Sequence, residues 1–133
     1  MNAIRQSLQS PGQLPGGLKS DFLSDQVSTL YLFKEQTYRG RCIVAYRDHV
    51  NELFELSDSD LALYMQDVAK AARAMKEALG ADKINYGAYS DKLAHLHFHL
   101  VPKYEDGPRW GTTFTMMPEP KSFSRRAGPG TRV

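Results

Sequence analysis

The sequence predicts a single globular domain that combines several β-strands with one long helix. Its 133 residues are enough for one hydrophobic core, and 41% hydrophobic with 24% charged residues is the composition of a folded protein. One segment repeats apolar residues at helical spacing, while four others are rich in the β-branched and aromatic residues of strands. These observations favour a folded domain over a disordered chain.

The first predicted elements follow a polar N-terminal arm. Residues 1–19 are rich in Gln, Ser, Pro and Gly, so we expect this arm to be flexible. The runs VSTLYLF (27–33) and RCIVAYR (41–47) are separated by KEQTYRG, in which Gly40 suits a turn. We therefore predict a hairpin at the start of a domain that covers residues 20–120.

One long helix is predicted after the hairpin, ending at Gly80. Its start carries Ser and Asp side chains at 57–60, which accept hydrogen bonds from free N–H groups and complement the positive end of a helix. Apolar side chains recur at three- and four-residue steps and form one stripe: Leu61, Tyr64, Met65, Val68, Ala72, Met75 and Leu79. Spacing this regular indicates core packing rather than a ligand site.

Two further strands and an irregular C-terminal part complete the predicted domain. The runs KINYGAY (83–89) and HLHFHLVPKY (95–104) are joined by SDKLA. From residue 105 the chain is broken by Pro and Gly, and only TTFTMM (112–117) is a candidate for a short additional strand. Residues 121–133 are expected to form a flexible basic tail.

Charge, cysteine content and hydropathy narrow the class of protein. The formal net charge is +2, from 17 basic and 15 acidic residues, which does not suggest a nucleic-acid-binding surface. Cys42 is the only cysteine, so an internal disulfide is impossible and a reducing cytoplasm is expected. No run approaches the ~20 apolar residues of a membrane span, and the N-terminus has no apolar secretion signal.

The run HLHFHLVPKY holds three of the four histidines in the chain. Side chains alternate between the two faces of a strand, so His95, His97 and His99 share one face and the apolar residues between them share the other. The apolar face is expected to pack on the helix. Three histidines in a five-residue window are improbable by accident, which makes the other face a candidate active site.

Two kinds of chemistry are open to this row of imidazoles. A rise of ~3.3 Å per residue places the Cα atoms of His95 and His99 about 13 Å apart, too far to share one metal ion. A metal site would need two neighbouring histidines with His49 or a carboxylate. The alternative needs no metal: a neutral His97 attacks phosphorus, its neighbours bind the phosphate oxygens, and a backbone carbonyl holds its other ring nitrogen.

The run HLHFHLV resembles the His-x-His-x-His-x-x pattern of the histidine triad (HIT) proteins. The resemblance extends over about residues 21–110 and includes the hairpin, the long helix and the strand with NYG. It implies an α+β fold with a five-stranded antiparallel sheet, one long helix and short extra helical or turn elements. It also implies a homodimer that binds nucleotides and cleaves at the α-phosphorus through a covalent nucleotidyl-histidine.

The resemblance assigns a role to several residues. It implies that His97 is the nucleophile, that His95 and His99 flank it, and that Asn85 contacts phosphate. His49 falls close to the active centre of the family, although a histidine at the end of a strand is equally often only exposed. We expect no metal and no cofactor.

Other positions depart from the family pattern. Arg41 follows Gly40 where many members have another histidine, so a permanent cation near the phosphates is expected instead. The loop SDKLA replaces the usual Gly-Gln-Ser or Gly-Gln-Thr, and Lys92 is a candidate to neutralise a leaving phosphate, while Ser90 is expected to be a turn residue. The run DGPRWG resembles the C-terminal part of the dinucleoside polyphosphate hydrolase branch of the family, and its Trp110 is a candidate to stack on a base.

The expected function is hydrolysis of dinucleoside polyphosphates or related nucleotidyl conjugates. A nucleoside phosphoramidase is the alternative among enzymes. A non-catalytic nucleotide-binding module is the second alternative, suggested by Arg41 and the altered loop, and a metalloprotein that uses two triad histidines with His49 is the third.

Overall fold

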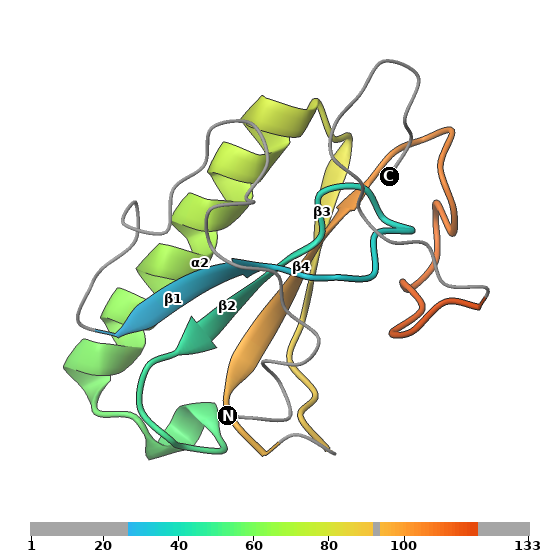
Figure 1. Cartoon of the computed structure of the whole chain (residues 1–133). Coiled ribbons are helices and arrows are strands. Elements are labelled where there is room, and N and C mark those ends of the chain that lie inside the picture. Colours follow the sequence, from blue (N-terminus) through green and yellow to red (C-terminus); the bar gives the residue numbers. More distant parts are fainter. Residues whose placement is uncertain (1–26, 92–93, 120–133) are drawn as a thin grey trace.

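The computed structural model describes residues 27–91 and 94–119 (Figure 1). The arm predicted at 1–19, the basic tail predicted at 121–133 and the side chain of Lys92 therefore lie outside the described residues. The elements, in chain order, are β1 (Ser28–Leu32), β2 (Cys42–Tyr46), the 3-10 helix η4 (Leu53–Glu55), α2 (Asp58–Leu79), β3 (Lys83–Gly87) and β4 (His97–Lys103).

The four strands form one antiparallel sheet in the order β1-β2-β4-β3. The hairpin predicted from the sequence is the β1-β2 pair, and β4, which carries His97 and His99, is an inner strand between β2 and β3. The register places Ala45 opposite His97, and both Ile43 and Gly87 opposite His99. Because both neighbours are hydrogen-bonded to β4, the histidines stand on a rigid element.

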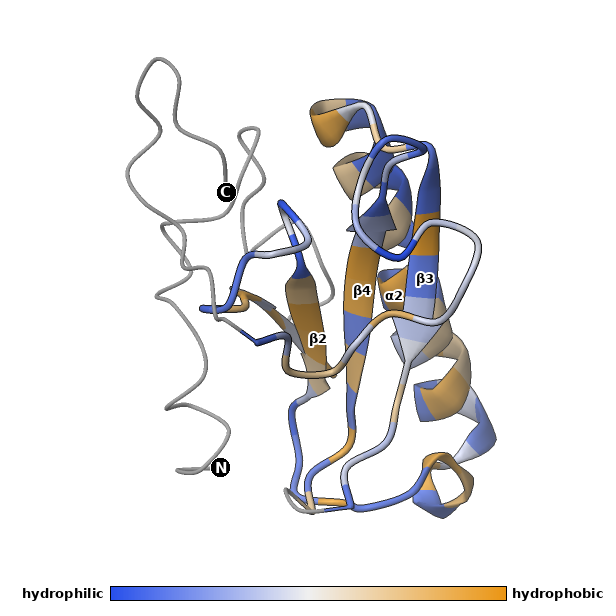
Figure 2. Ribbon diagram, turned by 90° about the vertical axis from the view of Figure 1, so that its right-hand side faces the viewer, coloured by the Kyte–Doolittle hydropathy of each residue, from blue (hydrophilic) through white to orange (hydrophobic). Residues whose placement is uncertain are grey.

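The helix α2 begins and ends as its capping residues predict. The Ser57 hydroxyl accepts the Asp60 N–H at 3.2 Å, and Gly80 adopts the left-handed conformation with φ of 65°. Figure 2 shows the helix on one side of the sheet. Its buried face meets Leu30, Val44 and Leu100, and the Tyr64 hydroxyl donates to the Val44 carbonyl at 2.8 Å. The predicted helix is confirmed, and every member of its predicted core stripe except Leu61 belongs to the core cluster or packs against it.

The sheet differs from the expectation in its number of strands. The described residues form four strands where the resemblance implied five. The run at 112–117, a candidate for a short strand, is irregular in the structure. Gly111, just before it, has a φ of +87°, and the Thr115 N–H donates to the Tyr38 hydroxyl at 2.7 Å. The segment is therefore held against Tyr38, in the connection between β1 and β2, and residues 112–117 are called the cover below.

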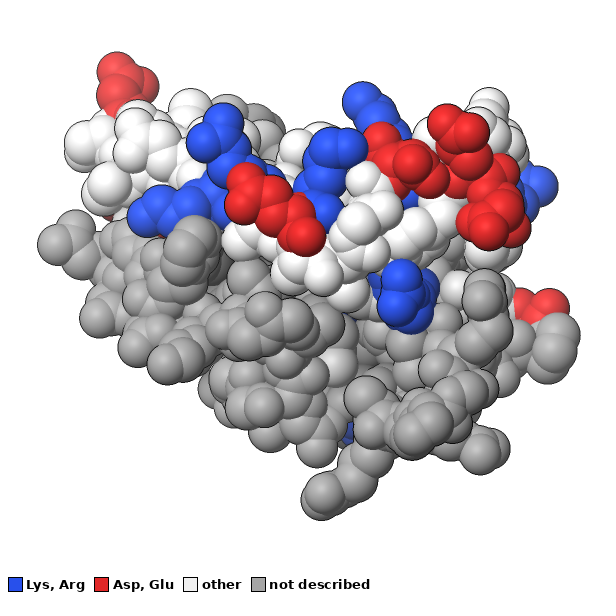
Figure 3. All heavy atoms as spheres, turned by 90° about the horizontal axis from the view of Figure 1, so that it is seen from above, with Lys and Arg blue, Asp and Glu red and all other residues white. Residues whose placement is uncertain are grey.

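Charged residues of both signs lie among one another on the face shown in Figure 3. This distribution agrees with the small net charge of +2 and gives no field of one sign among the described residues of that face. Within residues 27–91 and 94–119, no helix combines the length and the apolar character needed to cross a membrane.

Candidate active site

The three histidines of the β4 segment lie on the sheet face opposite α2. Leu96 and Leu100 belong to the helix-side core, while Ile43 and Ala45, the strand partners of His99 and His97, form a second cluster with Phe33. The histidine side chains are buried, with 3–5% of each exposed. The alternation predicted from the sequence is thus present, and its polar face is packed rather than open to water.

His97 has a fixed proton arrangement. Its Nδ1 lies 2.6 Å from the carbonyl oxygen of His95, and a carbonyl can only accept, so Nδ1 carries the proton. Burial lowers the pKa of His97, and the carbonyl only partly opposes this effect. The side chain is therefore neutral at pH 7, with the lone pair on Nε2. The backbone carbonyl expected from the sequence is present and comes from His95.

Ser90 provides a second contact to His97. Its hydroxyl lies 3.2 Å from His97 Nδ1 and 3.3 Å from the His95 carbonyl oxygen. The residue has a φ of 62°, which is unusual for a side chain other than glycine. The sequence favoured a turn residue here, and the structure gives Ser90 a left-handed backbone with its hydroxyl against the central histidine.

His95 and His49 lie side by side. The Nε2 of His95 donates to the Tyr46 carbonyl at 2.7 Å, and its Nδ1 faces the Nδ1 of His49 at 3.3 Å. Burial lowers the pKa of His95. The structure thus brings the exposed His49 to one end of the row. The described residues contain no group of three or more His, Cys, Asp or Glu side chains that could hold a metal ion.

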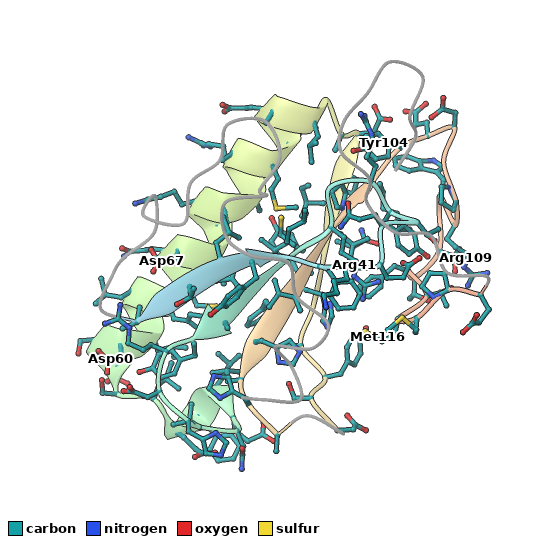
Figure 4. All side chains as sticks on the ribbon, in the orientation of Figure 1. Arg41, Asp60, Asp67, Tyr104, Arg109 and Met116 are labelled. Atoms are coloured by element: carbon teal, nitrogen blue, oxygen red, sulfur yellow. The ribbon has the colours of Figure 1, made fainter. Side chains whose placement is uncertain are left out.

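Arg41 lies at the other end of the row and is fully buried. Its Nη2 contacts His99 Nδ1 at 3.0 Å and Met116 Sδ at 3.1 Å (Figure 4). The guanidinium stands 4.2 Å from the Phe33 ring centre and 5.2 Å from that of Phe114. Burial lowers the Arg41 pKa to about 10, which leaves the group charged at neutral pH.

His99 is the most strongly perturbed of the three histidines. Burial, the Arg41 charge and then His97 lower its pKa to about 2, so it is neutral at physiological pH. Its ring meets Phe33 edge to face at 5.3 Å and lies 5.1 Å from the ring of His97.

The segment 112–117 covers the His99 end of the row. Phe114 lies 6.3 Å from the ring of His99 and 6.2 Å from that of Tyr38. At its start the segment is held by Lys103, whose Nζ donates to the carbonyls of Arg109 and Thr112 at 2.7 Å. Sequence analysis missed this cover because the apolar residues of TTFTMM are equally typical of a strand.

Two other predicted site residues, Asn85 and Trp110, are located by their place in the fold. Asn85 stands opposite Val101 on β3, and because directly paired residues share a face, it lies on the histidine side of the sheet. Trp110 is 42% exposed in the loop that Lys103 anchors, at the end of β4 away from His97.

The chain is similar in sequence to several curated proteins. The chain is 25% identical over 95 residues to "Protein hit" of Bacillus subtilis, which covers 68% of this chain and 66% of the relative. It is 27% identical over 82 residues to the adenosine 5'-monophosphoramidase hnt1 of Schizosaccharomyces pombe, covering 58% of this chain and 59% of the relative. The matched parts span between about half and two thirds of the curated relatives' length.

Solved structures show the same fold. The crystal structure of a histidine triad protein from Sinorhizobium meliloti superposes with a TM-score of 0.75 at 21% identity, over 94% of this chain and 84% of the other. A member of the HIT family from Bacillus subtilis gives a TM-score of 0.60 at 23% identity, over 69% of each chain. The model of the HIT domain matches residues 20–106, and the chain belongs to the HIT domain family.

Proposed function

We propose that this protein is a nucleotide hydrolase that cleaves dinucleoside polyphosphates or related nucleotidyl conjugates at the α-phosphorus. The observation that carries the proposal is the state of His97: a neutral ring with its Nδ1 proton held by a carbonyl, which leaves a lone pair on Nε2. That is the form of imidazole that attacks phosphorus. Membership of the HIT domain family supports the same chemistry.

The reaction proceeds in two displacements. The Nε2 lone pair forms a bond to the α-phosphorus, the bond to the bridging oxygen breaks, and the electron pair leaves with the phosphate. His97 then carries a positive charge, which the His95 carbonyl and the Ser90 hydroxyl stabilise through Nδ1–H. Water attacks the same phosphorus and gives up a proton to solvent, and the nucleoside monophosphate leaves the neutral ring.

The remaining sequence candidates take supporting roles in this proposal. His95 and His99 flank the nucleophile, and Asn85 stands on the same face of the sheet. Lys92 neutralises the leaving phosphate, and Trp110 stacks on a base. His49 supports the site through its contact with His95.

The leaving group separates this reaction from phosphoramidate cleavage. A phosphate leaves as an anion at pH 7, because its second pKa is about 6, whereas an amine must first be protonated. Burial lowers the pKa of all three row histidines, so they are uncharged at neutral pH and hold no imidazolium proton to give to an amine. This electrostatic state favours a polyphosphate substrate. The similarity to the phosphoramidase of Schizosaccharomyces pombe favours a phosphoramidate substrate instead. Phosphoramidase activity is therefore the second candidate function.

Trapping the covalent intermediate tests the proposal. The protein is mixed with diadenosine tetraphosphate, quenched without acid, and weighed by intact-protein mass spectrometry beside His97→Ala. We expect one added adenylyl group on the unchanged protein only, or rapid release of nucleoside monophosphate. Intact substrate with no mass gain would instead favour a nucleotide-binding module. A parallel reaction with adenosine 5'-phosphoramidate ranks the two substrate classes.

We also propose a cytoplasmic homodimer. Both β1 and β3 are edge strands of the described sheet, and exposed edges favour pairing. Tyr86 on β3 is 53% exposed, which suits a contact at that edge. Light scattering coupled to size-exclusion chromatography measures the oligomeric state directly.

A further inference from the structure

The contact between Arg41 and His99 has only one possible direction. A guanidinium donates hydrogen bonds and cannot accept them, so the Nη2–H of Arg41 requires a lone pair on His99 Nδ1, 3.0 Å away. A neutral imidazole with a lone pair on Nδ1 carries its proton on Nε2. The identity of one neighbour therefore determines the proton arrangement of His99.

The guanidinium is held firmly in this position. It is fully buried between the rings of Phe33 and Phe114, and its second Nη2 neighbour is the Met116 thioether, a weak acceptor. Within the described residues, the Nε and Nη1 of Arg41 have no hydrogen-bond partner. The imidazole nitrogen is thus the strongest acceptor in contact with this cation, and releasing it would leave the Nη2–H without a good partner.

At the same ring position, Nδ1, His97 has a hydrogen-bond partner of the opposite kind. His97 Nδ1 faces a carbonyl, which can only accept, whereas His99 Nδ1 faces a guanidinium, which can only donate. The two ring centres are 5.1 Å apart on one face of β4. Two identical side chains are therefore prepared for different tasks, one with a lone pair on Nε2 and one with a proton there.

We propose that Arg41 is a positioning residue that fixes His99 as a neutral imidazole protonated on Nε2, so that His99 donates a hydrogen bond to a phosphate oxygen while His97 attacks. This inference rests on the proposed function for its catalytic consequence. A histidine, which the family pattern often has at this position, can donate or accept and would not impose one arrangement. Arginine can only donate, so it allows only the Nε2-protonated form of His99, and its effect on catalysis passes through His99.

Nitrogen NMR of the imidazole rings tests the arrangement without any substrate. The rings are labelled with 15N, and His99 is assigned by the signal lost in His99→Gln. We expect an unprotonated Nδ1 and a protonated Nε2 in the resting protein at pH 7. A protonated Nδ1 would overturn the inference even if His97 proves to be the nucleophile, so the two proposals fail separately.

A double-mutant cycle tests the catalytic consequence. Removing one hydrogen-bond donor to a developing phosphate charge lowers kcat by a factor of about 10²–10³. In Arg41→Met the His99 ring is still present and can carry its proton on either nitrogen. We therefore expect this variant to lose less, about tenfold in kcat. The Gln side chain of His99→Gln carries an N–H donor and has no alternative proton arrangement. Arg41→Met in that background should therefore cost no more than about twofold. An equal loss in both backgrounds would refute action through His99.

Matched variants control for charge and folding. Arg39 lies on the same connection but is exposed, so Arg39→Met removes the same charge by the same substitution and should leave kcat unchanged. If Arg41→Met does not fold, Arg41→Lys keeps a cationic donor at the site. The NMR signature of His99 should then persist in Arg41→Lys, and its reversal would count against the inference.

Discussion

Substituting Ser90 by glycine and by alanine separates backbone strain from hydrogen bonding. The left-handed conformation costs a residue other than glycine roughly 1–2 kcal/mol, and Ser90 has a φ of 62°. Both variants lose the hydroxyl contacts to His97 Nδ1 and to the His95 carbonyl. Only glycine also relieves the strain, at an entropic cost of about 0.4–1 kcal/mol in the unfolded chain. Ser90→Gly should therefore be the more stable variant by about 1 kcal/mol.

Urea unfolding followed by circular dichroism measures this difference between the two variants. Activity, unlike stability, should be the same in the two variants. Both lose one hydrogen bond of about 0.5–1.5 kcal/mol, which corresponds to roughly a two- to tenfold lower kcat. A less stable Ser90→Gly would contradict the strain argument. Unequal activities would mean that the backbone of the loop, rather than the hydroxyl, supports His97.

Three further predictions concern stability and the cover. The pKa of His99 is about 2 in the folded protein and about 6.5 when unfolded. The unfolded state therefore binds more protons between these values, and the free energy of unfolding should fall below pH 6.5 by up to about 1.4 kcal/mol per pH unit. The loss should be smaller in His99→Gln, and an unchanged pH profile of the urea midpoint would contradict this assignment. Gly40→Ala should destabilise the protein by about 2 kcal/mol or more, because φ is +90° and a Cβ would lie 2.3 Å from Leu79 Cδ1; a melting temperature equal to that of the unchanged protein would contradict it. Tyr38→Phe removes the acceptor of the Thr115 N–H, so amide exchange at Thr115 should accelerate about two- to tenfold for a bond of about 0.5–1.5 kcal/mol, while unchanged protection would show that other contacts hold the cover.

Local patterns were sufficient to predict the helix, four strands and the shared face of the histidines. Helix α2 follows its Ser57 cap and its Gly80 stop, because capping and apolar periodicity act over one or two turns. The alternation in HLHFHLV likewise determines which side chains share a face, because the pleat of a strand has a period of two.

The surroundings of the histidines depend on contacts between distant segments, which no local pattern contains. Arg41 was expected near the phosphates because it replaces a histidine of the family pattern, and the structure shows it buried against aromatic rings. Met116, 75 residues further along the chain, contacts it. TTFTMM has the composition of a strand, but the turn at Gly111 and the hydroxyl of Tyr38 direct it elsewhere.

In the cover at 112–117, the residues that attach the segment differ from the side chains that contact the site. Its attachments are Lys103 at the far end of β4 and Tyr38 before β2, and neither belongs to the histidine row. Phe114 and Met116 both contact Arg41, and Phe114 also lies beside the ring of His99, so exchanging them acts on the His99 end of the row while the cover stays attached. Libraries randomised at these two positions would vary the surroundings of Arg41 and His99 without changing the residues that attach the cover.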